Sequence, residues 1–199
     1  MDGRRQRGDR ARAQILDQAI AIASTDGLDG LSIGRVAGQA GVAKGNIQVL
    51  FGDKEALQIA TLEHAIAFYR RLVVTPAMAL ATPAARLRAL VAGWFDYVAR
   101  RDLPGGCLIN AVSSEYRARP GRIRDWLADR RAATRRDFGA LIREAQAAGE
   151  YRGDLDVDQF VFDLAAYQAV ANVAALMDDH DDFARARASS LSRLDAAAL

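Results

Sequence analysis

The stretch Ser32–Leu57, SIGRVAGQAGVAKGNIQVLFGDKEAL, decides the fold of this chain. In its first half, apolar residues between Ile33 and Ala40 recur at i, i+3, i+4 and i+7, a spacing that predicts one apolar face of a short helix. Ser32 precedes that face and can accept a hydrogen bond from a free amide at the helix start. Gly41 follows it and can end the helix in the left-handed conformation.

A second short helix is predicted from Lys44, with Ile47 and Phe51 four residues apart on its inner face. Two short helices joined by a tight turn that contains glycine form a helix-turn-helix. In that motif the second helix lies in the major groove, and its amide side chains can contact adenine edges. The outward residues predicted to contact DNA are Lys44, Gly45, Asn46, Gln48 and Val49.

Residues 40–57, AGVAKGNIQVLFGDKEAL, resemble the DNA-binding signature of the TetR family of transcriptional regulators. Ala43, Gln48 and Leu50 depart from it, because the family usually has serine, an aromatic residue, and histidine or an aromatic residue at these positions. The resemblance implies DNA contacts from Lys54, and we include Ser32 among the expected contacts. It also implies an all-α fold of about nine helices. The expected domains are a basic arm with a three-helix DNA-binding domain, residues 1–53, and an effector-binding and dimerisation domain, residues 54–199.

The composition agrees with a helical protein that contacts DNA locally. Apolar residues make up 51% of the 199 residues and there are only four prolines, which favours helices. The net charge is only +2, so affinity for nucleic acid must come from a local excess of positive charge. The first 12 residues hold five arginines and two aspartates. They are interpreted as a basic arm that contacts DNA through Arg4, Arg5 and Arg7, with a solvated tail as the alternative.

Other classes of protein are not expected. No apolar stretch is long enough to span a membrane, no signal peptide is expected, and a single cysteine fits the reducing cytoplasm. His64 and His180 are far apart, and no catalytic, metal-binding or cofactor-binding set is expected. The acidic run Asp178–Asp182 is interpreted as a loop between helices rather than as a metal site.

The remaining helices are predicted from periodicity and from glycine and proline. Pro76 is expected to kink or end the fourth of them. The predicted helices cover residues 9–26, 53–80, 84–101, 107–118, 122–149, 157–177 and 183–199.

The helix predicted over residues 157–177 is apolar on nearly every side and must therefore be covered on every side. A second subunit is the natural cover for the part that one short chain leaves exposed. The resemblance implies that the last two helices pair with their copies in a homodimer that matches a palindromic operator. The residues assigned to this interface are Phe160, Leu164, Tyr167, Ala171, Ala174, Phe183, Arg187, Leu191 and Leu194.

Large rings with a few polar groups in the middle of the chain suggest a small-molecule site, although each could equally be an ordinary core residue. The candidates are Trp94, Tyr97, Cys107, Asn110, Tyr116, Trp126 and Tyr167. The expected function is that of a repressor that a small-molecule effector releases from double-stranded operator DNA. The alternatives are an architectural DNA-binding protein without an effector, and a helical carrier or enzyme that has lost operator binding.

Overall fold

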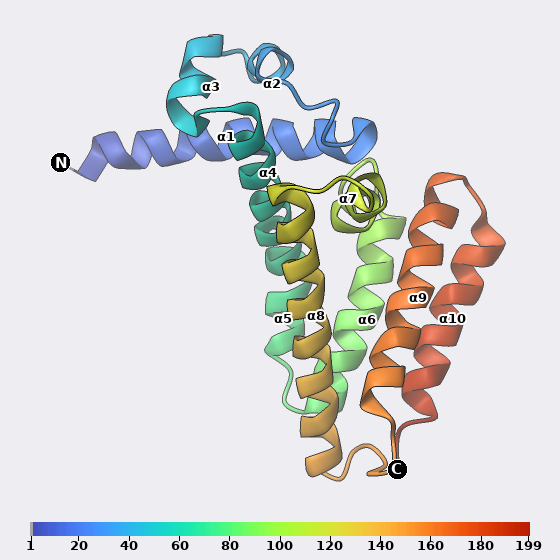
Figure 1. Ribbon diagram of the computed structural model, residues 1–199. Helices are drawn as coiled ribbons and strands as arrows, with labels where there is room; N and C mark the ends of the chain where they lie inside the picture. The colour runs from blue at the N-terminus through green and yellow to red at the C-terminus, as the bar shows by residue number, and fades with distance from the viewer. Residues whose placement is uncertain (1) are drawn as a thin grey trace. The chain divides into compact units, whose positions relative to one another are not determined.

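The computed structural model describes residues 2–199, apart from the side chains of residues 2–5 and 7. Over this range the protein is all-α, as predicted, and its only β-type pairing is an isolated bridge between Tyr151 and Ala198 (Figure 1). The helices are α1 Asp2–Asp26, α2 Ile33–Ala40, α3 Lys44–Phe51, α4 Lys54–Tyr69, α5 Thr75–Met78, α6 Pro83–Ala99, α7 Leu108–Tyr116, α8 Arg122–Ala147, α9 Val157–Leu176 and α10 His180–Asp195.

The chain forms two compact units, which we describe separately. One unit contains the residues up to Phe68 together with Leu103–Arg124, and the other contains Tyr69–Asp102 together with Asp125–Leu199. The first unit therefore combines α1–α3 and most of α4 with α7, which comes from the middle of the chain. The predicted domain boundary at residue 53 stays a prediction, because each compact unit is made of two separate segments of the chain rather than of the residues on one side of a single boundary.

In the N-terminal unit, α1 buries the apolar face expected for it, including Ile15, Ala19 and Ala23. The helix is longer than predicted, because its backbone is helical from Asp2 rather than from about Asp9. It ends at Gly27, whose φ of +72° lies in the left-handed region that favours glycine. The short loop that follows buries Leu28 and Leu31 completely.

Helix α4 continues through a π-helical turn, Arg70–Val74, into α5, so the three segments form one continuous helix. The amide of Thr75 donates to the carbonyl oxygen of Arg70, five residues earlier. Pro76 has no amide proton, and its ring crowds the carbonyl four residues before it. The wider π turn directly before Pro76 accommodates that ring, which is why the helix continues to Met78 rather than ending there.

The second unit packs α6 against α9 and α10. Phe95 of α6 and Phe160 of α9 are completely buried in its core. The acidic run is not a simple loop, because α10 begins inside it at His180. The Asp179 carboxylate accepts a hydrogen bond from the amide of Asp182 at 3.0 Å and caps the helix, as acidic residues do at helix starts.

Candidate nucleic-acid interface

Helix α2 is defined at both ends by the residues that the sequence indicated. The hydroxyl oxygen of Ser32 accepts a hydrogen bond from the amide of Arg35 at 3.2 Å. Gly41 has a φ of +66°, and the amide of the next residue, Val42, donates to the carbonyl oxygen of Ala37 at 3.0 Å. This arrangement satisfies carbonyl groups at the helix end and sets the sharp turn into α3.

Helix α3 has one buried and one exposed face. Ile47 is completely buried and Phe51 nearly so, and the guanidinium carbon of Arg12 lies 4.8 Å from the centre of the Phe51 ring. Val49 is 87% exposed. All five residues predicted to contact DNA from this helix are exposed: Lys44, Gly45, Asn46, Gln48 and Val49.

The polar groups of this exposed face are available for a ligand. Within the described part of the chain, neither the Asn46 nor the Gln48 side chain has a hydrogen-bond partner, and the Lys44 ammonium has no ion-pair partner. A methyl group built on Gly45 would meet no protein atom within 4 Å. Ala43 occupies the N-cap without a side-chain hydrogen bond, and the Asn46 amide donates to the carbonyl oxygen of Ala43 at 3.0 Å. The amides of Lys44 and Gly45 remain open to an acceptor such as phosphate.

Other predicted DNA contacts have different surroundings. Lys54 is exposed, but its ammonium group donates to the carbonyl oxygen of Asp29 at 3.2 Å, so in this structure it holds a loop of its own unit. The Ser32 hydroxyl serves as the cap described above. Arg4, Arg5 and Arg7 belong to the helical backbone of α1, and their side chains lie outside the described residues.

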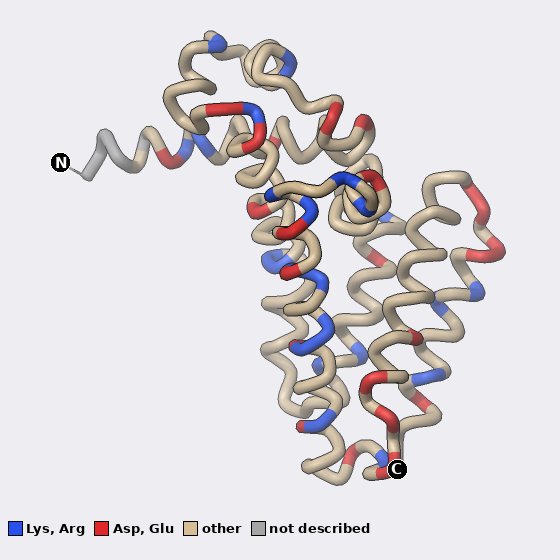
Figure 2. The backbone as a smooth tube through the Cα atoms, viewed as in Figure 1, with Lys and Arg blue, Asp and Glu red and all other residues tan. Residues whose placement is uncertain are grey.

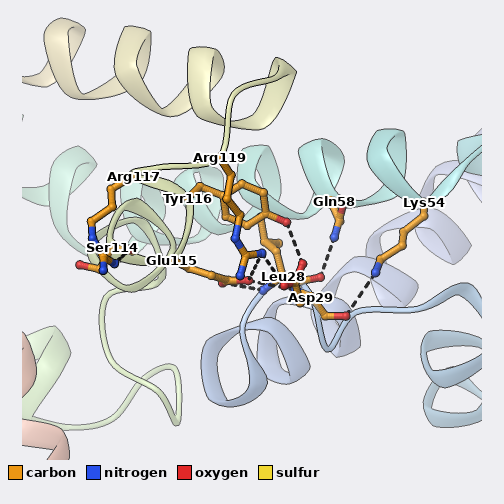
Figure 3. A network of polar contacts seen from close by, with 9 residues as sticks. All are labelled: Leu28, Asp29, Lys54, Gln58, Ser114, Glu115, Tyr116, Arg117 and Arg119. Atoms are coloured by element: carbon orange, nitrogen blue, oxygen red, sulfur yellow. Dashed lines mark hydrogen bonds and ion pairs between the residues drawn. The ribbon is translucent and has the colours of Figure 1, made fainter.

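The structure adds a polar network around Asp29 that the sequence analysis did not select (Figure 3). The Asp29 carboxylate accepts a hydrogen bond from the Tyr116 hydroxyl at 3.2 Å and forms an ion pair with Arg119. The Arg119 guanidinium lowers the pKa of Asp29, while burial and the nearby Asp29 carboxylate raise the pKa of Tyr116 to about 12. Partners 87 and 90 positions apart leave no local signal in the sequence.

The candidate effector residues are distributed over both units. Trp94 and Tyr97 are buried in the second unit, where the ring centres of Tyr97 and Tyr69 lie 5.3 Å apart, and Trp126 and Tyr167 are half-buried there. Cys107, Asn110 and Tyr116 belong to the N-terminal unit. The effector site stays a prediction.

The face of α9 assigned to the dimer interface points into its own unit and needs correction. Phe160, Leu164, Ala171, Ala174 and Leu194 are buried within the single chain. A second subunit cannot contact side chains that already form the core. Tyr167 and Leu191 are half-buried, and their place in the interface stays a prediction.

The two remaining residues of that set also have partners in the same chain. The ring centre of Phe183 lies 5.7 Å from that of Phe95. Arg187 forms an ion pair with Asp96, with 2.7 Å between the nitrogen and the oxygen. The exposed apolar residues lie on the opposite side of α9 and at its end: Phe162, Val170, Val173, Leu176 and Met177.

Charged residues occur along the backbone of both units, and several Lys or Arg positions follow one another on α8 (Figure 2). Among the residues that the structure describes, no group of three or more His, Cys, Asp or Glu side chains is placed to hold a metal ion. In the same part of the chain, no helix has the length and apolar character needed to cross a membrane.

Two family models match the chain. Residues 15–61 match the model for bacterial regulatory proteins of the tetR family, and residues 83–190 match the tetracyclin repressor-like C-terminal domain. The first match contains the helix-turn-helix built by α2 and α3. The second covers more than half of the chain.

Similar proteins include two named regulators. The HTH-type transcriptional repressor NicS of Pseudomonas putida is 33% identical over 158 residues, which is 76% of this chain and 71% of NicS. The HTH-type transcriptional regulator BetI of Paraburkholderia phymatum is 38% identical over 90 residues. That match spans 43% of this chain and 44% of BetI, less than half of either protein.

Solved structures share the fold over nearly the whole chain. A TetR transcriptional regulator from Chloroflexus aurantiacus superposes with a TM-score of 0.86 at 21% identity, covering 97% of this chain and 98% of that one. AibR, in complex with isovaleryl coenzyme A and operator DNA, has a TM-score of 0.64 at 18% identity, covering 82% and 86%. The matches to the family models and to NicS show sequence similarity in addition to the shared fold, and this chain belongs to the TetR family of bacterial transcriptional regulators.

Proposed function

We propose that this protein is a cytoplasmic transcriptional repressor that binds a palindromic operator as a homodimer and is released by a small-molecule effector. The observation that carries the proposal is the exposed face of α3, where a lysine, two amide side chains and a glycine have no partner in the protein. A helix with such a face fits the major groove, where amides contact base edges and a lysine contacts phosphate.

A homodimer would place two copies of α3 in successive major grooves, about 34–36 Å apart. We assign its interface to the exposed side of α9 rather than to the residues that are buried in the protomer. Phe162, Val170, Val173 and Met177 follow one another at intervals of eight, three and four residues, so they form one stripe along the helix. An exposed apolar stripe of this kind is expected to be covered by a partner of the same kind.

Regulation by an effector is supported by the relatives. AibR was solved with both isovaleryl coenzyme A and operator DNA, so one protein of this fold binds a small molecule and an operator. For this chain we retain the aromatic and polar residues of α6–α9 as candidates, with the chemical class of the effector open. Binding would couple to operator affinity by about 1–3 kcal/mol, as is typical of such linkages.

A footprint of the purified protein on the DNA that flanks its own gene, at two salt concentrations, tests the proposal. The expected result is a protected, nearly palindromic site that persists at moderate salt. Weak protection that disappears with salt would mean binding to phosphates alone and would contradict an operator-specific repressor.

Two variants assign roles on α3. Lys44→Ala is expected to weaken binding to all duplexes and to reduce the salt dependence, because a phosphate contact is lost. Gln48→Ala is expected to change the preference among operator variants, because an amide that contacts a base edge is lost. A uniform loss in both variants across the panel would contradict this assignment.

A further inference from the structure

The loop between α1 and α2 is held through every backbone polar group of Leu28 and Asp29. The Glu115 carboxylate accepts hydrogen bonds from both amides, from Leu28 at 3.0 Å and from Asp29 at 3.1 Å. On the carbonyl side, the Gln58 side-chain amide donates to Leu28 at 2.6 Å and the Lys54 ammonium donates to Asp29 at 3.2 Å. Helix α7 thus binds the two donors, and helix α4 binds the two acceptors.

The side chain of Asp29 joins the same set of contacts. It accepts from the Tyr116 hydroxyl and pairs with Arg119, which also lies 3.9 Å from the Glu115 carboxylate. We call Lys54, Gln58, Glu115, Tyr116 and Arg119, with Leu28 and Asp29, the loop network. In Figure 3 these side chains converge on Leu28 and Asp29 from α4, from α7 and from the segment that follows α7.

Two glycines allow α7 and the loop before it to come this close. A methyl group on Gly27 would lie 2.6 Å from a carboxylate oxygen of Glu115, and the φ of Gly27 is also positive. A methyl group on Gly105, just before α7, would lie 1.6 Å from the carbonyl oxygen of Ser24 near the end of α1. The amide of Gly105 donates to the Ser24 hydroxyl at 3.2 Å. The segment around α7 therefore contacts α1 and its following loop at two points.

We propose that Glu115 and Arg119 are positioning residues for DNA binding: they contact no DNA, and they fix the Leu28–Asp29 loop that leads into α2 and, through it, into α3. This inference rests on the proposed operator binding. When all four backbone polar groups of the loop are hydrogen-bonded, the loop keeps one backbone conformation, and this conformation sets the orientation of α2. When the loop is loose, only a fraction of molecules presents α3 correctly, and the apparent operator affinity falls by that fraction.

Glu115→Gln is the informative variant. A carboxylate offers an oxygen to each of the two amides, whereas a glutamine offers one oxygen and places its own N–H groups against the second amide. The substitution also removes a negative charge, which by itself would strengthen binding to DNA. A loss of affinity therefore has the sign opposite to the electrostatic effect.

Arg119 has a matched control in Arg117. Both arginines follow the end of α7 and both are exposed. Among the described residues, the Arg117 side chain donates only to the carbonyl oxygen of Ser114 in α7, whereas the Arg119 side chain donates to the Asp29 carboxylate. Arg119→Gln and Arg117→Gln change the net charge equally. Only the first breaks the contact with the loop.

The experiment measures three quantities for the wild type and each variant. These are the dissociation constant for the duplex found by footprinting, hydrogen exchange of the peptide that contains Leu28 and Asp29, and thermal unfolding. We expect Glu115→Gln and Arg119→Gln to weaken duplex binding about tenfold and to speed exchange in that peptide, with Arg117→Gln unchanged in both.

Faster exchange without a loss of duplex affinity would overturn the proposal, because the loop would be released with no effect on binding. Unchanged exchange in both variants would overturn it as well. If Glu115→Gln fails to fold, Asp29→Asn replaces it, since it removes the ion pair with Arg119 and keeps both backbone amides. Failure of the wild type to bind the duplex would instead refute the proposed function, and the exchange data would still show whether Glu115 holds the loop.

Discussion

Gly45 is the residue at which the requirements of folding and of DNA binding separate most clearly. In the protein alone, a methyl group at this position would meet nothing within 4 Å, and alanine favours a helix over glycine by up to about 1 kcal/mol. We therefore expect Gly45→Ala to leave thermal stability unchanged or slightly higher. The same methyl group would separate the α3 backbone from the sugar-phosphate chain, so duplex affinity is expected to fall by about tenfold or more.

Gly38 provides the control for this experiment. It also lies in a helix and is exposed, and an added methyl group there would meet nothing within 4 Å. Gly38→Ala is expected to match Gly45→Ala in unfolding temperature and to match the wild type in fluorescence anisotropy with the footprinted duplex. Equal affinity of Gly45→Ala and the wild type would show that the backbone of α3 does not approach the DNA closely at this residue.

Val49 is an apolar side chain on an otherwise polar face, and its 87% exposure has no explanation in the folded chain itself. In the major groove the apolar partner for such a side chain is the methyl group of thymine. Replacing thymines of the operator by deoxyuridine, which lacks that methyl group, is expected to weaken wild-type binding about fourfold for each contacted base, the effect of exposing about one methyl group. Val49→Ala should lose most of this sensitivity. An identical loss for both proteins would contradict the contact.

At the scale of the helix, α2 and α3 differ in how they begin. Ser32 caps α2 through its hydroxyl, and Ala43 leaves α3 without a side-chain cap. Ser32→Ala is expected to lower the free energy of unfolding by about 1 kcal/mol, and Ala43→Ser to raise it by a similar amount. In urea denaturation these changes would appear as midpoint shifts of opposite sign at an unchanged slope. A stabilising Ser32→Ala would contradict the cap.

The helices also show what a sequence can and cannot predict. The inner faces of α2 and α3 follow from periodicity, α2 ends before Gly41 as expected, and α3 begins at Lys44 as expected. Several residues predicted for the interface on α9 are buried in the protomer instead, because a helix that is apolar all round has no periodic signal to distinguish its core side from its exposed side. Only the packing of α6 and α10 shows that Leu164 is inside and that Val170 is outside.

At the scale of the whole molecule, contacts between residues far apart in the chain are the part of the structure that the sequence does not predict. The exposed face of α3 could be predicted because its residues are neighbours in one short helix. The loop network could not, because Glu115 and Leu28 are 87 positions apart and no motif joins them. Backbone groups of a loop carry no residue-specific signal, so the partners of these groups become visible only in the folded chain.

The ionisation of Tyr116 in the N-terminal unit and of Tyr151 in the second unit opposes folding. Burial raises the pKa of Tyr151 from 10.0 to about 12, and the pKa of Tyr116 is also about 12, mainly because of burial. The folded state therefore holds protons that the unfolded state loses between pH 10 and pH 12. The stability contributed by neutral tyrosine is complete below pH 10 and falls as the pH rises, by up to about 2 kcal/mol for each residue.

Absorbance at 295 nm and thermal unfolding between pH 9 and pH 12 test this expectation. Tyr116 and Tyr151 should titrate near pH 12 or only on unfolding, and Tyr151→Phe should make the loss of stability at high pH less steep. A Tyr151→Phe variant with the same pH dependence as the wild type would show that ionisation of this residue does not oppose folding.

A charge introduced on the exposed side of α9 is expected to disrupt the dimer, whereas a charge on its buried side is expected to disrupt the fold. Val173 is 56% exposed on the proposed interface stripe, and Val173→Asp would place two like charges close together across a twofold axis. We expect sedimentation velocity to show a monomer, circular dichroism to show unchanged helical content, and duplex affinity to fall at least tenfold, because one subunit contacts only one half-site.

Two further variants serve as controls. Leu164→Asp, on the side of α9 that the sequence indicated, should unfold the protomer, because Leu164 is 2% exposed and a buried charge there would have no partner. Leu80→Asp, at an exposed leucine outside the stripe, should leave the dimer intact. A Val173→Asp protein that remains dimeric would place the subunit contact elsewhere on the surface.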